Sequence, residues 1–232
     1  MKRTTTKFTI IVSLILVIVG LAISFVVRAS FLSVGIENIN HIDDLKNLAI
    51  TLEYSWGQDG NAQTLIDDLT NNQEYYINEL DTAKSILIVE PTGALKQYRG
   101  SFSQTVKVVT VVKSAVDYVI EDDLITIFQY GGFTNVSGSI IYNQTSNIMY
   151  PDQMYLVFLD ESELNTRANT KEFSFCNGIF ACVKLTERNK QSPCVMSFND
   201  GLESMQFCAT DEILSAFERV EEAILEKYVA YE

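Results

Sequence analysis

The longest apolar run of the chain covers residues 8–27, from Phe8 to Val27, and follows a short basic segment. Its twenty residues include no charged side chain. As an α-helix at about 1.5 Å per residue, the run would extend roughly 30 Å, the thickness of the hydrocarbon core of a bilayer. The pattern predicts a transmembrane signal anchor, with residues 1–30 forming a cytoplasmic tail and the membrane span.

The basic residues around this run predict its orientation. Three of them precede it, whereas Arg28 alone follows it before the first acidic residues. Because basic segments stay on the cytoplasmic side, residues 29–232 are predicted to be extracytoplasmic. Cleavage near Ala29 is the alternative, and it would produce a secreted domain. The run is longer than the apolar core of an ordinary signal peptide, which favours the retained anchor.

Helical periodicity is found on either side of the middle of the chain. Apolar residues recur at helical spacing over about 37–55 and again over 61–80, with a glycine-containing turn between. We expect these segments to form a helical hairpin or stalk within residues 31–82. Residues 212–228 predict an amphipathic C-terminal helix, capped by Thr210 or Asp211.

The pattern between these helices changes to short apolar and β-branched runs, which are typical of strands. They lie at 86–89, 104–113, 123–128, 155–159, 173–175 and 180–185. The last two flank Asn177-Gly178, a dipeptide that predicts a two-residue hairpin turn. Five or more strands with uneven loops predict an antiparallel barrel or sandwich. The fold class is therefore α+β, with residues 83–232 as an extracytoplasmic β-rich domain.

Four of the strand sequences carry a family resemblance. In chain order they are Ser85-Ile-Leu-Ile-Val-Glu90, Val106-Lys-Val-Val-Thr-Val-Val-Lys113, Asp123-Leu-Ile-Thr-Ile-Phe128 and Met154-Tyr-Leu-Val-Phe-Leu159. This order resembles uncharacterised membrane-anchored extracytoplasmic proteins of Gram-positive bacteria. The resemblance covers residues 84–185 and implies an OB-like β-barrel core without catalytic residues. The insertion at 134–150 and the C-terminal cysteine region depart from the compact form of such a barrel.

Charge narrows the range of partners. The chain has 17 Lys+Arg and 30 Asp+Glu, a formal net charge of −13, and every acidic residue follows the apolar run. An extracytoplasmic part this acidic repels phosphate groups, so we expect no nucleic-acid partner. The expected partners are the lipid bilayer, through the N-terminal helix, and a protein or other cell-surface component.

The four cysteines, Cys176, Cys182, Cys194 and Cys208, all lie in the last third of the chain. An even number in an exported chain predicts two disulfides. Zinc is the competing interpretation, but the spacing contains no C-x-x-C pair. In the predicted hairpin Cys176 and Cys182 point to opposite faces, which makes a bond between them awkward. We therefore expect the pairs Cys182–Cys194 and Cys176–Cys208.

No residue pattern in the sequence is typical of a catalytic, cofactor-binding or metal site. The only histidine, His41, is expected on a solvated helix face, far in sequence from any nucleophile. Carboxylates cluster at 121–123, 160–163 and 199–203, where strands or turns end. We interpret them as solvated turn acids, with acid–base chemistry or Ca²⁺ binding as the alternative.

Two segments are candidates for ligand recognition. The polar insertion at 134–150 is the stronger, because long polar loops on rigid scaffolds tend to carry function. Tyr54, Trp56, Tyr75 and Tyr76 form the other, although packing of the helices against the β-core is the simpler account.

The sequence therefore predicts a non-enzymatic, single-pass membrane protein with an extracytoplasmic binding or interaction domain. One alternative is a secreted or anchored hydrolase that uses the carboxylate clusters. Another is a type IV pilin-like structural subunit, because Lys7-Phe8-Thr9-Ile10-Ile11 resembles the start of such proteins. Val12 stands where that family has an acidic residue, and Thr6-Lys7 replaces its glycine.

Overall fold

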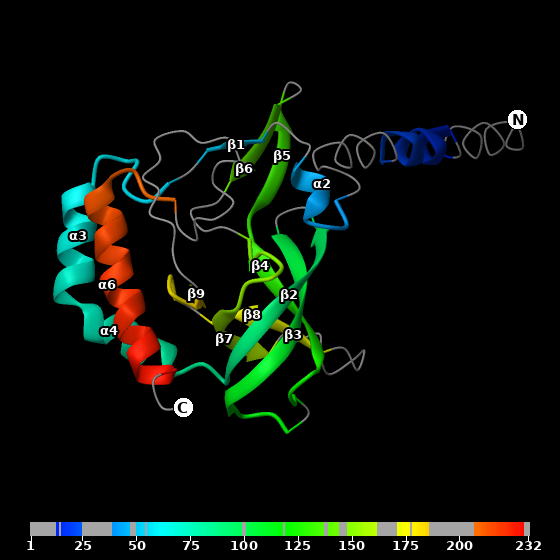
Figure 1. The fold of residues 1–232 in the computed structure, drawn as a ribbon. Helices are drawn as coiled ribbons and strands as arrows, with labels where there is room; N and C mark the ends of the chain where they lie inside the picture. Colours follow the sequence, from blue (N-terminus) through cyan, green and yellow to red (C-terminus); the bar gives the residue numbers. More distant parts are fainter. Residues whose placement is uncertain are drawn as a thin grey trace, which may run out of the picture.

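The computed structural model describes residues 13, 15–24, 39–46, 50–53, 55–98, 101–117, 119–136, 139–143, 148–161, 171–176, 178–185 and 207–229. The fold class is α+β, as predicted. A closed five-stranded β-barrel occupies the centre, and helices cover one side of it (Figure 1).

The barrel closes through a single continuous set of strand pairs. Its strands, in the order in which they pair, are β2 (Ser85–Gln97), β3 (Ser101–Ser114), β4 (Leu124–Tyr130), β8 (Glu172–Phe175) and β7 (Tyr155–Glu161). β7 then pairs with β2 and completes the ring. The predicted barrel is confirmed, with one correction: β4 and β8 are parallel, whereas the other neighbouring strands of the ring are antiparallel.

Barrel strands that are apolar on both faces form two cores. On β2, Leu87 and Val89 point into the barrel, while Ile86 and Ile88 point outward toward the helices. β7 behaves in the same way, and its residues 155–159 are all buried. This double burial explains why both segments are continuous apolar runs in the sequence rather than alternating ones.

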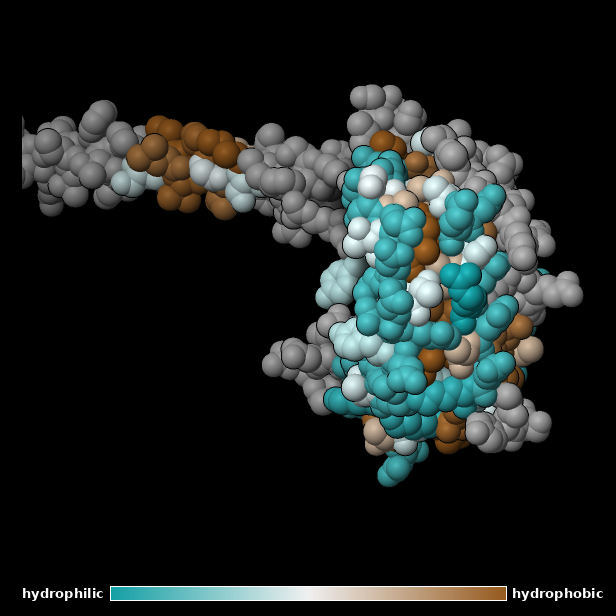
Figure 2. All heavy atoms as spheres, turned by 90° about the vertical axis from the view of Figure 1, so that its left-hand side faces the viewer, coloured by the Kyte–Doolittle hydropathy of each residue, from teal (hydrophilic) through white to brown (hydrophobic). Residues whose placement is uncertain are grey.

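Three helices form a layer over the outer face of β2 and β7 (Figure 1, left). They are α3 (Ala62–Asn71), α4 (Gln73–Leu80) and α6 (Asp211–Tyr228). α6 is the predicted amphipathic helix, and its cap is confirmed because the Thr210 side chain accepts a hydrogen bond from the Ile213 N–H at 3.3 Å. The outward face of the layer is predominantly hydrophilic (Figure 2).

A carboxylate fastens the end of this layer. Asp81, just after α4, accepts hydrogen bonds from Lys227 Nζ at 2.6 Å and from the Tyr228 hydroxyl at 2.5 Å. Burial favours its neutral form, but these bonds and the positive charges of Lys227 and Lys113 outweigh burial and hold the pKa of Asp81 below its ordinary value. The contact joins the C-terminal end of α6 to the end of α4.

The predicted helix over 37–55 is wrong. The structure has a single turn, α2 (Asp43–Lys46), followed by a short strand, β1 (Ile50–Leu52). Residues just before α2 pair instead with β2: the Leu95 N–H donates to the Asn40 carbonyl at 3.0 Å, and the Ile42 N–H donates to the Gly93 carbonyl at 2.9 Å. The apolar spacing that suggests a long helix comes from one docked segment whose side chains enter a third core.

Asn72 interrupts the second predicted helix. It ends α3 and begins α4, and its side-chain amide donates to Asp68 Oδ1 at 2.6 Å. The described part of residues 31–82 is therefore not a two-helix hairpin. α3 and α4 pack against α6 instead.

The polar insertion between β4 and β7 contains two strands. β5 (Gly132–Val136) and β6 (Ser139–Asn143) form a hairpin, and β1 pairs with β6 in parallel to make a small three-stranded sheet. The sheet lies at the upper end of the barrel in Figure 1.

The predicted hairpin around Asn177-Gly178 is also wrong. β8 and β9 (Cys182–Lys184) do not pair with each other; both pair with β7, end to end along one side of it. The Cys176 N–H donates to the Phe158 carbonyl at 2.9 Å, and the Phe158 N–H donates to the Ala181 carbonyl at 2.9 Å. The chain thus leaves the edge of β7 after Cys176 and returns at Ala181.

Within the described residues, no helix combines the length and the apolarity that crossing a bilayer requires. Of the predicted span 8–27, the structure describes residue 13 and residues 15–24, which are helical. Their large apolar side chains are exposed, for example Leu16 at 66 % (Figure 2, brown). The membrane span stays a prediction.

Candidate functional site

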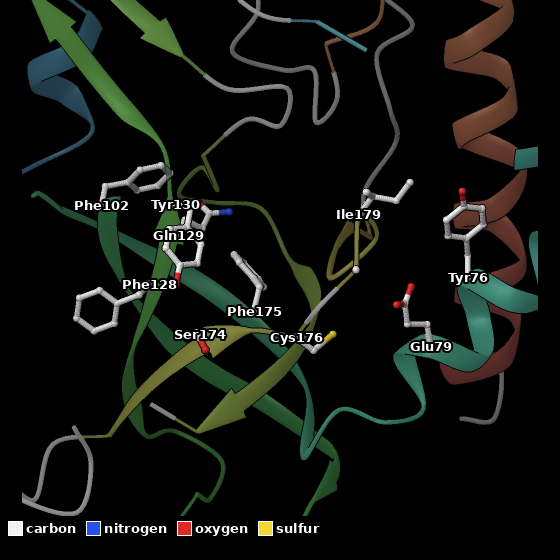
Figure 3. Close-up of a pocket in the computed structure, with 11 residues that line it drawn as sticks. Tyr76, Glu79, Phe102, Phe128, Gln129, Tyr130, Ser174, Phe175, Cys176 and Ile179 are labelled. Carbon is white, nitrogen blue, oxygen red and sulfur yellow. The ribbon is translucent and has the colours of Figure 1, made fainter. Parts of the chain in front are cut away.

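A groove of about 520 Å³ opens between strands β4 and β8 of the barrel and helix α4 (Figure 3). We call it the β4–α4 groove. The described residues that line it are Tyr76, Glu79, Phe102, Phe128, Gln129, Tyr130, Ser174, Phe175, Cys176, Gly178 and Ile179. Its volume falls within the range of ordinary ligand pockets.

The excursion of the chain between β8 and β9 shapes this groove. After Phe175 the backbone turns away from β7 toward α4, and Cys176, Gly178 and Ile179 line the groove where it does so. A Cβ atom at Gly178 would lie 3.3 Å from Leu80 Cδ2 at the end of α4. Close approach of this loop to α4 therefore favours glycine at position 178.

Aromatic side chains form the β4 wall of the groove. Phe128 and Tyr130 are two residues apart and share the outer face of the strand (Figure 3). Tyr130 is 87 % exposed, which is unusual for a large aromatic side chain. The Tyr98 ring packs on Phe128 with centroids 5.7 Å apart, and Lys96 Nζ lies 5.4 Å from the Tyr98 centroid. In Figure 3 the Phe128 ring points away from Phe175, Cys176 and Glu79, so the exposed aromatic surface of β4 at the groove is that of Tyr130.

The lining of the groove also contains polar residues. Gln129 lies between Phe128 and Tyr130 in sequence and therefore belongs to the opposite face of β4, with Ile127; its Oε1 atom is buried without a hydrogen-bond partner among the described residues. An unpaired buried acceptor costs about 1–3 kcal/mol. Ser174 on β8 and Glu79 on α4 complete the polar lining (Figure 3).

Burial, with a smaller contribution from nearby carboxylates, raises the pKa of two groups in the groove lining. Burial raises the pKa of Cys176 to about 12, and the charges of Asp160 and Glu79 add to the shift. Tyr76 has its pKa raised to about 12 by burial, by its hydrogen bond to Asp68 and by the charges of Asp68 and Glu79. The Cys176 thiol is therefore protonated at neutral pH and is a poor nucleophile.

The cysteines differ from the prediction. Cys176, Cys182 and Cys208 are buried free thiols, so the predicted Cys176–Cys208 disulfide is absent; Cys194 lies outside the described residues, and Cys182 is unpaired. Cys176 belongs to the core beneath the helices and Cys182 to the barrel interior. Cys208 forms a β-bridge with Trp56, so its segment pairs with the segment around Trp56 and not with the segment of Cys176.

The other sequence candidates do not gather in the groove. His41 lies before α2, in a bridge with Ala94 rather than on a helix, and its Nδ1 accepts from the Asp43 N–H at 3.2 Å. Asp122 and Asp123 form ion pairs with Lys107 and Lys171. In the described part of the chain no group of three or more His, Cys, Asp or Glu side chains is arranged to hold a metal ion.

The aromatic candidates are distributed between packing and exposure. Trp56 packs on Phe217 with ring centroids 5.5 Å apart, and Tyr76 packs on Phe180 at 5.6 Å. Tyr75 is exposed, and Tyr54 and the carboxylates at 199–203 lie outside the described residues. The carboxylate cluster at 160–163 has a member beside the groove. Asp160 on β7 is the register partner of Ser174 on β8, and Ser174 lines the groove.

Sequence reasoning missed the residues of the groove itself. The spacing of Phe128 and Tyr130 on a strand was an available signal, because two aromatic side chains two residues apart share a face. Nothing in the sequence places Glu79 opposite them, since that depends on how α4 packs against the barrel.

No protein-family model and no curated protein matches this chain.

Proposed function

We propose that the chain is a membrane-anchored extracytoplasmic binding module and that the β4–α4 groove holds its ligand. The exposed aromatic wall carries this proposal. Tyr130 is 87 % exposed at the end of barrel strand β4, and Phe128 lies on the same face of that strand. Exposed rings beside a few oriented polar groups are typical of ligand recognition.

The strand order supports an OB-like interpretation of the barrel. Numbered along the chain, the barrel strands pair in the order first, second, third, fifth and fourth, and the third and fifth are parallel. OB-folds are five-stranded Greek-key barrels that bind extended ligands on an outer face. Residues of the third and fifth strands line the groove.

The apolar run at 8–27 supports the anchoring part of the proposal, since its length matches a bilayer and its basic flank matches an N-in orientation. The test is fractionation of cells producing the full chain, followed by protease treatment of intact cells. An anchored protein stays with membranes at alkaline pH and loses its C-terminal domain to external protease. Recovery of a form that begins near Ala29 in the medium would replace anchoring with secretion.

The binding test uses the full chain in lipid nanodiscs and a panel of labelled probes. The panel contains peptides of one length with cationic, neutral or acidic side chains, together with neutral oligosaccharides. Ser174→Trp places a large side chain in the groove and is expected to weaken binding at least tenfold. Ser215→Trp, the same change at an exposed position of α6 outside the groove, should alter affinity less than twofold.

Binding that Ser174→Trp leaves unchanged in a folded protein would refute the assignment of the site. The same conclusion follows if no probe in the panel binds. Far-UV circular dichroism of both variants establishes that the fold is retained.

A further inference from the structure

An exposed aromatic patch lies at the tip of the β2–β3 hairpin. Its centre is Tyr98, which is 38 % exposed and is not among the described residues that line the groove. The Phe128 ring, which points away from the groove in Figure 3, packs on Tyr98 with centroids 5.7 Å apart. Lys96 Nζ lies 5.4 Å from the Tyr98 centroid. We call Lys96, Tyr98 and Phe128 the hairpin-tip patch.

The backbone of the barrel holds this patch in place. The Tyr98 N–H donates a hydrogen bond to the Ser101 carbonyl at 2.7 Å, which fixes the turn between β2 and β3. Lys96 on β2 and Phe128 on β4 are both register partners of Ser103 on β3, so they share one face of the sheet. The patch is therefore a preformed surface of the barrel.

The segment before α2 joins the barrel at this same end. His41 forms an antiparallel bridge with Ala94 of β2, and α2 follows at the upper end of the barrel (Figure 1). In an antiparallel pair, earlier residues of one segment lie beside later residues of the other. The backbone from His41 back to Ile39 thus runs toward the Tyr98 end of β2. The chain that carries the apolar run at 8–27 therefore reaches the barrel at the end with the patch.

A short connection limits how far this end can lie from the membrane. Residues 28–38 separate the apolar run from Ile39. Even fully extended, about eleven residues span no more than about 40 Å. In the anchored chain the patch is therefore held close to the bilayer at a high effective concentration. A contact too weak to form from solution can form under that restraint.

The side chains of the patch suit the headgroup level of a bilayer. Tyrosine is enriched there, because its ring enters the apolar boundary while its hydroxyl stays hydrated. Lysine lays its stem along apolar surface and keeps its ammonium group among the headgroups. Tyr98 and Phe128 supply the rings, and the exposed Lys96 supplies the cation. The net charge of −13 opposes an anionic surface, so the match is to a zwitterionic bilayer.

We propose that the hairpin-tip patch docks on the bilayer that holds the anchor of the same chain, with the Tyr98 ring at the headgroup level. The proposal rests on the anchoring part of the proposed function and adds a second membrane contact to it. This contact decides which end of the barrel faces the membrane. The helical layer, whose outward face is hydrophilic, lies on the side of the barrel away from α2 and stays in water (Figures 1 and 2).

The test places a tryptophan in the patch and measures its contact with lipid. The full chain with Tyr98→Trp is reconstituted in phosphatidylcholine vesicles, with or without bromine atoms in the upper acyl chains, which quench nearby indole rings. Tyr75→Trp is the matched control, because Tyr75 is 62 % exposed on α4. Bromine should quench the Tyr98→Trp chain at least threefold more than the control. The unchanged chain gives the contribution of Trp56, its only tryptophan.

Two lysine variants, each combined with Tyr98→Trp, assign the quenching to the patch. Lys96→Glu should reduce it at least twofold, because a carboxylate at this position is repelled by the lipid phosphates. Lys84→Glu makes the same change at an exposed position just before the other end of β2, and should leave the quenching unchanged. Far-UV circular dichroism establishes that each variant is folded.

The outcomes separate this proposal from the proposed function. Chains that do not float with the vesicles refute the anchor and the docking together. Chains that float but show equal quenching of Tyr98→Trp and Tyr75→Trp keep the anchor and refute the docking alone. A blue shift of Tyr98→Trp emission that needs several chains per vesicle, without quenching by bromine, would assign the patch to a second copy of the chain and also overturn the proposal.

Discussion

Phe217 of α6 joins the helical layer to the barrel, and its removal tests how that layer is held. The ring is fully buried at 0 % exposure. It packs against Trp56 and Phe180, with ring centroids 5.5 Å and 5.3 Å away. Replacing a buried phenylalanine with alanine costs about 3–5 kcal/mol, which includes the lost ring pairs and the cavity left behind. For a chain of this size, the loss lowers the melting temperature by about 10 °C.

Tyr130→Ala is the matched control, because it removes a ring of similar size that is 87 % exposed. We expect it to change the free energy of unfolding by less than about 0.5 kcal/mol. The measurement is urea unfolding of the full chain in mild detergent, followed by far-UV circular dichroism. Equal midpoints for Phe217→Ala and Tyr130→Ala would contradict the packing of α6 described above.

Three further changes test other contacts. Gly93→Ala should lower the melting temperature more than Gly60→Ala: both glycines have positive φ, but a Cβ at Gly93 would also lie 2.4 Å from a histidine ring, whereas nothing is within 4 Å at Gly60. Asp81→Asn should cost roughly 0.5 kcal/mol at pH 7, because the carboxylate is half exposed. Since the folded-state pKa of Asp81 is lowered, this difference should persist above pH 4 and decrease as pH falls through the folded pKa; a difference that increases as the pH is lowered below 4 would refute the assignment. Burial raises the pKa of Cys176 and Cys208 to about 12, so Ellman's reagent without reductant should titrate neither in the folded chain and at least three thiols after denaturation; fewer would indicate disulfides.

The strands of the barrel could be predicted because their apolar runs are too long and too continuous for any other environment. Residues such as Ile86 and Leu87 are buried on opposite faces, and this double burial is visible in the sequence. The pairing of β8 could not be predicted in the same way. Asn177-Gly178 favours a local turn, but the unpaired edge of β7 competes for the flanking backbone, and Phe158 pairs with Cys176 and Ala181 instead.

The first predicted helix failed for a related reason. Ile39, Ile42 and Leu45 have helical spacing over one turn, and their burial comes from docking on the end of β2 rather than from a long helix. The groove depends even more on tertiary structure. Phe128 and Tyr130 share a face by strand geometry, but the position of Glu79 across from them is set by the packing of α3, α4 and α6 on the barrel.

The parallel pair of β4 and β8 has a consequence for how the barrel forms and opens. Strands β2, β3 and β4 are consecutive and can pair early, whereas β4 meets β8 only after the intervening hairpin and β7 are in place, and then over three register pairs. Long loop closure makes this seam late to form. β8 has three register pairs with β4 and three with β7, so the edges of β8 are where the barrel opens first. Phe128 and Ser174 are partners in the seam and also line the groove. A ligand that contacts both residues would stabilise the β4–β8 pairing. Slowed amide hydrogen exchange at residues 126–128 would therefore report its binding.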